Sequence, residues 1–144
     1  MVMKLKFWKG IVIFSLACSV LDVVTLPALA HHSFAMFDFD KTISCPATVK
    51  EFRWTNPHVT LLIEASPKPG DPPEIWSLEL TSPGNLTRLG WTHGSFKPGD
   101  RIDIQFNPLR DGKHGGAFLE AKIQATGQVL KSSVRDANDT PNLQ

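Results

Sequence analysis

Hydrophobic and polar residues alternate along most of the chain after residue 45, a pattern that predicts a succession of short strands. The clearest case lies at residues 101–107, where Ile102, Ile104 and Phe106 alternate with polar side chains. Because each such strand has one apolar and one polar face, we expect antiparallel pairing with one face in water. The other segments with this period are residues 46–54, 58–65, 74–80, 117–123 and 126–130.

In the segment at residues 46–54, the apolar side chains switch from one face of the strand to the other. Ala47 and Val49 share one face of a regular strand, whereas Phe52 and Trp54 fall on the other. An extra residue in the strand would bring all four side chains to the same side, so the pattern predicts a β-bulge between Val49 and Phe52.

A short helix is predicted between the third and fourth strands. Ser82 is a favourable N-cap, Pro83 suits the first helical position, and Gly90 suits the end. Three strands, one short helix and two or three further strands match a small antiparallel barrel of the OB type, with five to six strands. A small β-sandwich is the alternative.

The first thirty residues have the order of a secretory signal peptide. Lys4, Lys6 and Lys9 precede an apolar stretch at residues 11–24, and small residues at Ala28 and Ala30 end it. We therefore expect cleavage after Ala30, a periplasmic or secreted location, and no stable membrane insertion of the mature chain. A retained N-terminal anchor is the alternative. The mature chain then consists of a barrel domain at residues 31–131 and a polar, aperiodic tail at residues 132–144 that we expect to be disordered.

Charge and cysteine content exclude some classes of protein. Removing three lysines and Asp22 with the leader from totals of 15 basic and 14 acidic residues leaves 12 and 13. This balance, without a basic stripe, argues against a nucleic-acid partner. Only Cys45 remains after the leader, so no internal disulfide can form, and we interpret this cysteine as a small buried core residue.

Several motifs together resemble a known family. They are "AHHSFAMFD", "FRWTNPHVTLLIE", "WSLELTSPGNLTRLGW", "KPGDRIDIQFNPLRDGKHGG" and "FLEAKI". Over residues 30–131 the chain resembles the bacterial exported proteins called domain of unknown function 6152. The resemblance implies export and a small β-rich domain, and it implies no activity.

The histidines are the best candidates for chemistry. Cleavage after Ala30 would make His31 the first residue, so that its free amine and the rings of His31 and His32 lie together. An N-terminal histidine can chelate through amine and ring, and one more imidazole, from His32 or His58, completes a nitrogen set that suits Cu(II). We expect His58 on the outer face of its strand, opposite Val59. The hypothesis is a copper site at His31, His32 and His58. The alternative is that these histidines are surface residues without a metal.

Further candidates lie in predicted loops. His93 and His114 could add ligands, and Trp54 and Trp91 could line a groove for a small ligand or a protein. For the tryptophans, core packing is the favoured interpretation.

The remaining polar residues do not form a recognisable catalytic set. Asp38 and Asp40 would point the same way on a strand, and a solvated face is their favoured interpretation. No nucleophile motif or acid–base pair stands out, so the sequence favours a binding or accessory domain, for a metal ion or an unknown periplasmic partner. A copper-dependent oxidase is the least favoured alternative.

Overall fold

A computed structural model of the 144-residue chain describes residues 34–132 and 134. All of these residues belong to one structural unit, residues 33–144. The predicted leader, His31 and His32 lie outside the described residues. Of the predicted tail, only Ser132 and Val134 are described, and both side chains are buried. No helix among the described residues is long and apolar enough to cross a membrane.

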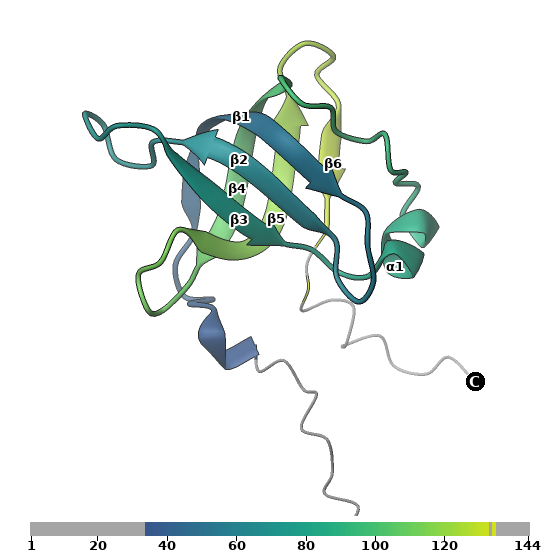
Figure 1. Ribbon diagram of the computed structural model, residues 1–144, viewed down its shortest axis with the longest axis horizontal. Helices are drawn as coiled ribbons and strands as arrows, with labels where there is room; N and C mark the ends of the chain where they lie inside the picture. Colours follow the sequence, from purple (N-terminus) through teal and green to yellow (C-terminus); the bar gives the residue numbers. More distant parts are fainter. Residues whose placement is uncertain (1–33, 133, 135–144) are drawn as a thin grey trace, which may run out of the picture. The chain divides into compact units, whose positions relative to one another are not determined.

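Six strands and two short helices make up the described chain (Figure 1). Their hydrogen-bonded order in the sheet is β3-β2-β1-β4-β5-β6, and β3 additionally pairs with β5. The elements are the 3-10 helix η1 (Phe34–Met36), β1 (Ile43–Arg53), β2 (Thr60–Ala65), β3 (Glu74–Glu79), α1 (Pro83–Arg88), β4 (Arg101–Pro108), β5 (Gly115–Ile123) and β6 (Val129–Lys131).

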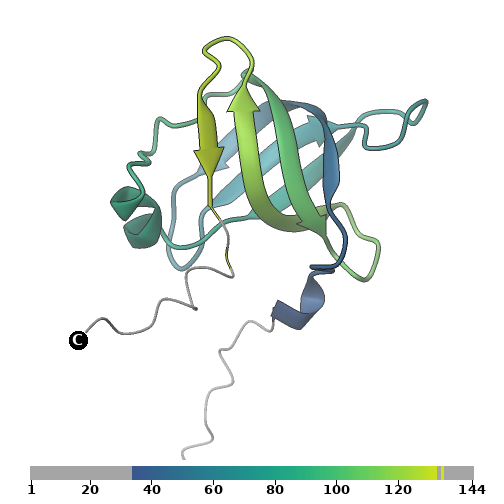
Figure 2. The same ribbon diagram turned by 180° about the vertical axis from the view of Figure 1, so that it is seen from behind.

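Pairing of β3 with β5 closes the first five strands into a barrel. This pairing is parallel and joins Ser77 to Gly115, Leu78 to Gly116, and Glu79 to Ala117, whereas all other strand pairs are antiparallel. Figure 2 shows β6 beside β5, where it extends the sheet beyond the closed barrel. The predicted OB-like barrel with one helix between the third and fourth strands is confirmed. The sequence does not predict its single parallel pair of strands. Alternation indicates which face of a strand is apolar, but not whether a neighbouring strand runs parallel or antiparallel to it.

The predicted bulge in β1 is also confirmed. Val49 pairs with Ile63 and Glu51 with Leu62, so Lys50 is the extra residue. The bulge restores the inward parity, and Phe52 packs against the core cluster although it lies three residues after Val49.

Two consecutive glycines allow β5 to approach its neighbours closely. A Cβ at Gly116 would collide with the backbone carbonyl oxygen of Asn107 and lie 2.6 Å from Cδ2 of Phe106. A Cβ at Gly115 would lie 2.8 Å from Cδ1 of Leu109. These contacts leave no room for a side chain at the point where β5 joins both β4 and β3.

The barrel encloses one continuous apolar core. Leu61, Leu78, Ile104 and Phe106 are among the side chains with no exposed surface. Helix α1 lies at one end of the barrel, where its Leu86 joins this core (Figures 1 and 2). Ser82 caps the helix as predicted, since its Oγ accepts a hydrogen bond from the Asn85 backbone N–H at 3.3 Å.

We predict that Gly116→Ala destabilises the fold by about 2 kcal/mol, because the added methyl group cannot be accommodated without moving a backbone carbonyl. Urea unfolding at neutral pH measures the change. Gly94→Ala is the control, since a Cβ there meets only Oγ1 of Thr92 at an ordinary 3.7 Å. Equal stability of the two variants would contradict the close approach at the barrel closure.

Candidate functional site

His58 lies at the junction of the β1–β2 loop and β2. The loop contains a cis peptide bond between Asn56 and Pro57. Beyond the ladder between β2 and β3, the backbone N–H of Leu80 donates to the carbonyl of Val59 at 2.8 Å, which extends the pairing toward His58. Val59 is fully buried and His58 keeps 33% of its side chain exposed, so the predicted outward orientation of His58 is confirmed.

The imidazole of His58 is held by Glu79, the last residue of β3. Nδ1 of His58 lies 2.5 Å from Oε1 of Glu79, and the Glu79 side chain is 27% exposed. With the carboxylate as the acceptor, the N–H at Nδ1 is the donor of this hydrogen bond. A carboxylate that fixes one ring nitrogen orients the other nitrogen as a ligand, an arrangement found in many metal sites.

Glu79 lies on the strand beside the one that the N-terminal segment of the described chain covers. Glu79 pairs with Ala117 of β5, and both residues lie on the outer face of the barrel, since Leu78 and Phe118 beside them are in the core. Ala117 is buried in a second apolar cluster together with Phe37 and Val134. The described segment that begins at Phe34 therefore packs, at Phe37, over the strand next to Glu79.

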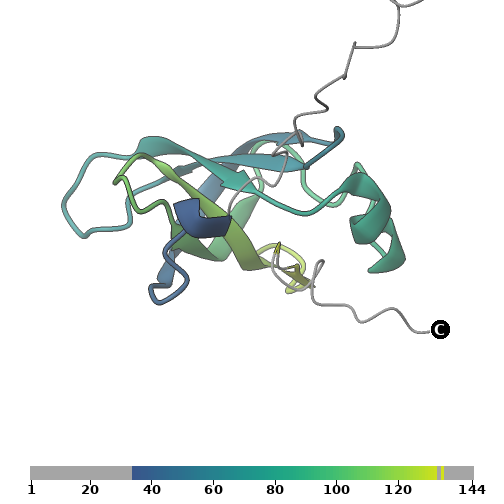
Figure 3. The same ribbon diagram turned by 90° about the horizontal axis from the view of Figure 1, so that it is seen from below.

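Backbone contacts fix the N-terminal segment against β4 and the turn that follows it. Phe37 forms an isolated bridge with Leu109, and the N–H of Arg110 donates to the carbonyl of Met36 at 2.9 Å. The N–H of Asp38 donates to the carbonyl of Pro108 at 2.8 Å. Figure 3 views the molecule from the side on which η1 lies.

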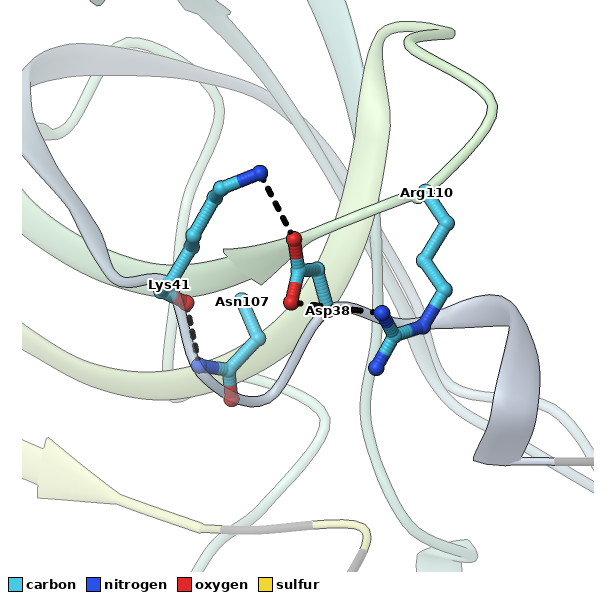
Figure 4. Close-up of polar contacts among 4 residues, drawn as sticks. All are labelled: Asp38, Lys41, Asn107 and Arg110. Carbon is cyan, nitrogen blue, oxygen red and sulfur yellow. Dashed lines mark hydrogen bonds and ion pairs between the residues drawn. The ribbon is translucent and has the colours of Figure 1, made fainter.

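Ion pairs of the Asp38 carboxylate with Lys41 and Arg110, here called the Asp38 clasp, add to these contacts (Figure 4). The carboxylate receives Nζ of Lys41 at 2.9 Å and a guanidinium nitrogen of Arg110 at 3.5 Å. The side-chain amide of Asn107 donates to the Lys41 carbonyl at 2.7 Å, which fixes the same turn from below. The hydrogen bond from Lys41, with the nearby charges of Lys41 and Arg110, lowers the pKa of Asp38 below its ordinary value of 3.8, against the opposing effect of desolvation.

This clasp corrects the interpretation of the two aspartates. Asp40 is exposed as expected, but Asp38 has only 8% of its surface exposed and does not share a solvated face with it. The two residues lie in a turn that precedes β1 rather than on a strand, so strand parity does not apply to them.

The other predicted site residues are dispersed. His93 is exposed in the loop after Trp91, and Trp91 itself is 3% exposed within the core. Trp54 is half-buried against the core, with its ring 5.7 Å from that of Phe52. His114 is exposed in the β4–β5 loop. Among the described residues, no three His, Cys, Asp or Glu side chains gather as metal ligands.

Comparison with known proteins places the chain in a family without an assigned function. A model described as "Family of unknown function (DUF6152)" matches residues 19–119. The chain belongs to this family. No curated protein and no solved structure matches it. The matched range of this DUF6152 chain includes His31, His58, Glu79 and the Asp38 clasp.

Sequence reasoning missed Glu79 and the clasp of Asp38. Glu79 follows Leu78 in alternation and reads as one more outward polar residue, because its partner His58 is remote in sequence. The motif around Arg110 reads as a turn, and nothing local indicates that its guanidinium pairs with a residue more than seventy positions earlier.

Cys45 of this DUF6152 member is an ordinary core residue, as predicted. It is 8% exposed, and desolvation by burial raises the pKa of its thiol above the ordinary value of 9.0. We expect the native protein to react slowly with a thiol reagent at neutral pH, because the reactive thiolate is scarce. The same protein in urea should react rapidly. Rapid labelling of the native form would contradict this assignment.

We predict that Asp38→Asn lowers the urea midpoint at neutral pH, because the variant loses the ion pairs with Lys41 and Arg110. A carboxyl whose pKa is lowered by folding stabilises the protein above its unfolded-state pKa, and this contribution is lost as pH falls through the folded-state value. The difference between variant and parent should therefore shrink below about pH 4.

Asp40→Asn is the matched control for this clasp, since Asp40 is exposed two residues away. It should leave the urea midpoint unchanged both at neutral pH and below about pH 4. A difference for Asp38→Asn that persists unchanged at low pH would show that the ion pairs do not account for it.

Proposed function

We propose that this DUF6152 protein is an exported accessory domain that binds Cu(II) at its mature N-terminus. In this proposal cleavage after Ala30 makes His31 the first residue, located outside the membrane that the leader directs it across. The amine and ring of His31 supply two nitrogen ligands, and Nε2 of His58 supplies the third. Imidazole and amine nitrogens in a tetragonal set suit Cu(II), which also heads the affinity series of divalent first-row metals.

The observation that carries the proposal is the contact between His58 and Glu79. Glu79 binds Nδ1 of His58 and so selects Nε2 as the ligating atom. The same carboxylate holds the ring in one orientation, which reduces the conformational freedom that a ligand loses on binding metal.

The length of the chain limits how far from Phe37 the proposed ligand His31 can lie. Phe37 packs over Ala117, the neighbour of Glu79 across the β3–β5 pair. Neighbouring strands lie about 4.8 Å apart. His31 lies six positions before Phe37, and η1 takes up Phe34–Met36, so the three residues before η1 add a reach of at most about 10 Å to the length of this helix. The proposal requires the amine of His31 to cover the remaining distance to His58 within this reach.

A second binding mode uses the N-terminus alone. The amine, the His32 amide nitrogen and the His32 ring can bind Cu(II) without any contribution from the barrel. The two modes differ in one respect that can be measured, because only the first depends on His58 and Glu79.

We expect the mature protein, with His31 confirmed as its first residue by intact mass, to bind Cu(II) with sub-micromolar affinity. His58→Ala and Glu79→Gln should each weaken binding by about tenfold or more, through loss of a ligand and loss of its orientation. Selective acetylation of the terminal amine should weaken it further, because it removes the chelate of amine and ring. Calorimetric titration with a competing chelator measures all four affinities.

His93→Ala is the matched control, since His93 is an exposed histidine in a separate loop. It should bind as the parent does. Sub-micromolar binding that survives acetylation of the amine would exclude a site built on the terminal amine. Binding that is lost on acetylation but unaffected in His58→Ala would assign the metal to His31 and His32 alone, and no binding in any form would end the metal proposal.

A further inference from the structure

Trp76 lies at the end of the barrel away from α1. It follows the inward parity of Leu78, and its ring packs 5.4 Å from that of Phe106. The exposed ring of His114, from the β4–β5 loop, stacks on it with centroids 4.8 Å apart and an angle of 27° between the planes. Figure 1 shows the β2–β3 and β4–β5 loops on the side of the barrel opposite α1, and residues of both loops line one cavity. The backbone N–H of Ser77 donates to the His114 carbonyl, which keeps the loop against β3.

The indole of Trp76 has an unmet hydrogen-bonding requirement. Its Nε1 is buried, and no described residue accepts a hydrogen bond from it. A buried donor without an acceptor is costly, and buried tryptophans generally have a partner for this group. Among the described side chains, only the Ser132 hydroxyl shares this condition. An acceptor oxygen brought to this end of the barrel would satisfy Trp76.

Two cavities flank the stacked rings. One has a volume of about 490 Å³ and the other about 190 Å³, and the walls of both include Pro67, Asp71, Trp76 and His114. Their combined size is that of a small-molecule site, and barrel mouths are a common location for such sites. None of these residues belongs to the His58–Glu79 pair.

The polar groups around the cavities are mixed in sign. The larger cavity is lined by Lys68 and by the hydroxyl-bearing residues Thr42 and Ser44, and both cavities include Asp71. Glu74 lines the smaller one. An anionic ligand would face two carboxylates, and a cationic ligand would face the Lys68 ammonium. A neutral ligand with many hydroxyl groups can donate to the carboxylates and accept from the ammonium and the indole N–H.

We propose that this end of the barrel binds a neutral saccharide. The exposed face of the His114 ring, which Trp76 supports from behind by stacking, provides a flat surface for the C–H face of a pyranose ring, while Asp71 and Lys68 hydrogen-bond with its hydroxyl groups. A sugar oxygen accepts the hydrogen bond from Trp76 Nε1, with a small shift of the exposed His114 ring to admit it. This site is independent of the copper site proposed above.

The test uses the mature protein, freed of metal with a chelator, and three neutral probes, which are maltotriose, cellotriose and chitotriose. The indole N–H resonances of Trp54, Trp76 and Trp91 are followed by two-dimensional NMR. We expect at least one trisaccharide at millimolar concentration to shift the Trp76 resonance saturably and to leave that of Trp91 in place. His114→Ala and Asp71→Asn, both substitutions of exposed residues, should weaken that binding by about tenfold.

His93→Ala controls for the loss of an exposed imidazole elsewhere and should bind the same probe as the parent does. Adenosine monophosphate and glycine betaine test an anionic and a cationic ligand under the same conditions. The proposal is overturned if no trisaccharide shifts the Trp76 resonance, if His114→Ala binds as tightly as the parent, or if either charged probe binds more tightly than the sugars.

Discussion

The parallel pairing of β3 with β5 is the constraint on which the rest of the structure depends. It closes the barrel, and it is possible because Gly115 and Gly116 let β5 approach Leu109 and Asn107 more closely than any side chain would allow. Closure does more than complete the core. It sets Glu79 of β3 beside Ala117 of β5. The carboxylate that contacts the His58 imidazole therefore lies next to the strand that the N-terminal segment covers.

The contacts outside the barrel are built on the pairing of Glu79 with Ala117. Phe37 and Val134 cover Ala117, so segments from the two ends of the described chain meet over the same strand. The Asp38 clasp then fixes the N-terminal segment through both charge and backbone hydrogen bonds. A segment anchored only by apolar contacts could slide or rotate on the barrel. The ion pairs of Asp38 with Lys41 and Arg110 fix the orientation of this segment.

The sequence predicts the local features of this fold well and its long-range contacts poorly. Alternation, the parity change at Val49 and Phe52, and the cap at Ser82 depend on neighbouring residues, and all three are confirmed. Glu79 opposite His58 and Arg110 opposite Asp38 are set by strand register and barrel closure, which no local pattern encodes. The alternation at residues 74–80 places Trp76 on the inward face, but it does not indicate that a loop histidine stacks on the ring or that the indole N–H lacks an acceptor. His58 combines a local and a long-range feature. Parity predicts that its side chain points outward, but it does not predict the contact with the Glu79 carboxylate.

The central claim is that Cu(II) bridges the mature N-terminus and His58. Its most direct test is the loss of amide NMR signals when a small fraction of an equivalent of Cu(II) is added to the mature protein, because a paramagnetic ion broadens the nearest nuclei first. The account predicts that the signals of His58, Glu79 and the first mature residues disappear together, while those of His93 and His114 remain. Broadening confined to the first residues, or centred on either of those loop histidines, would contradict it.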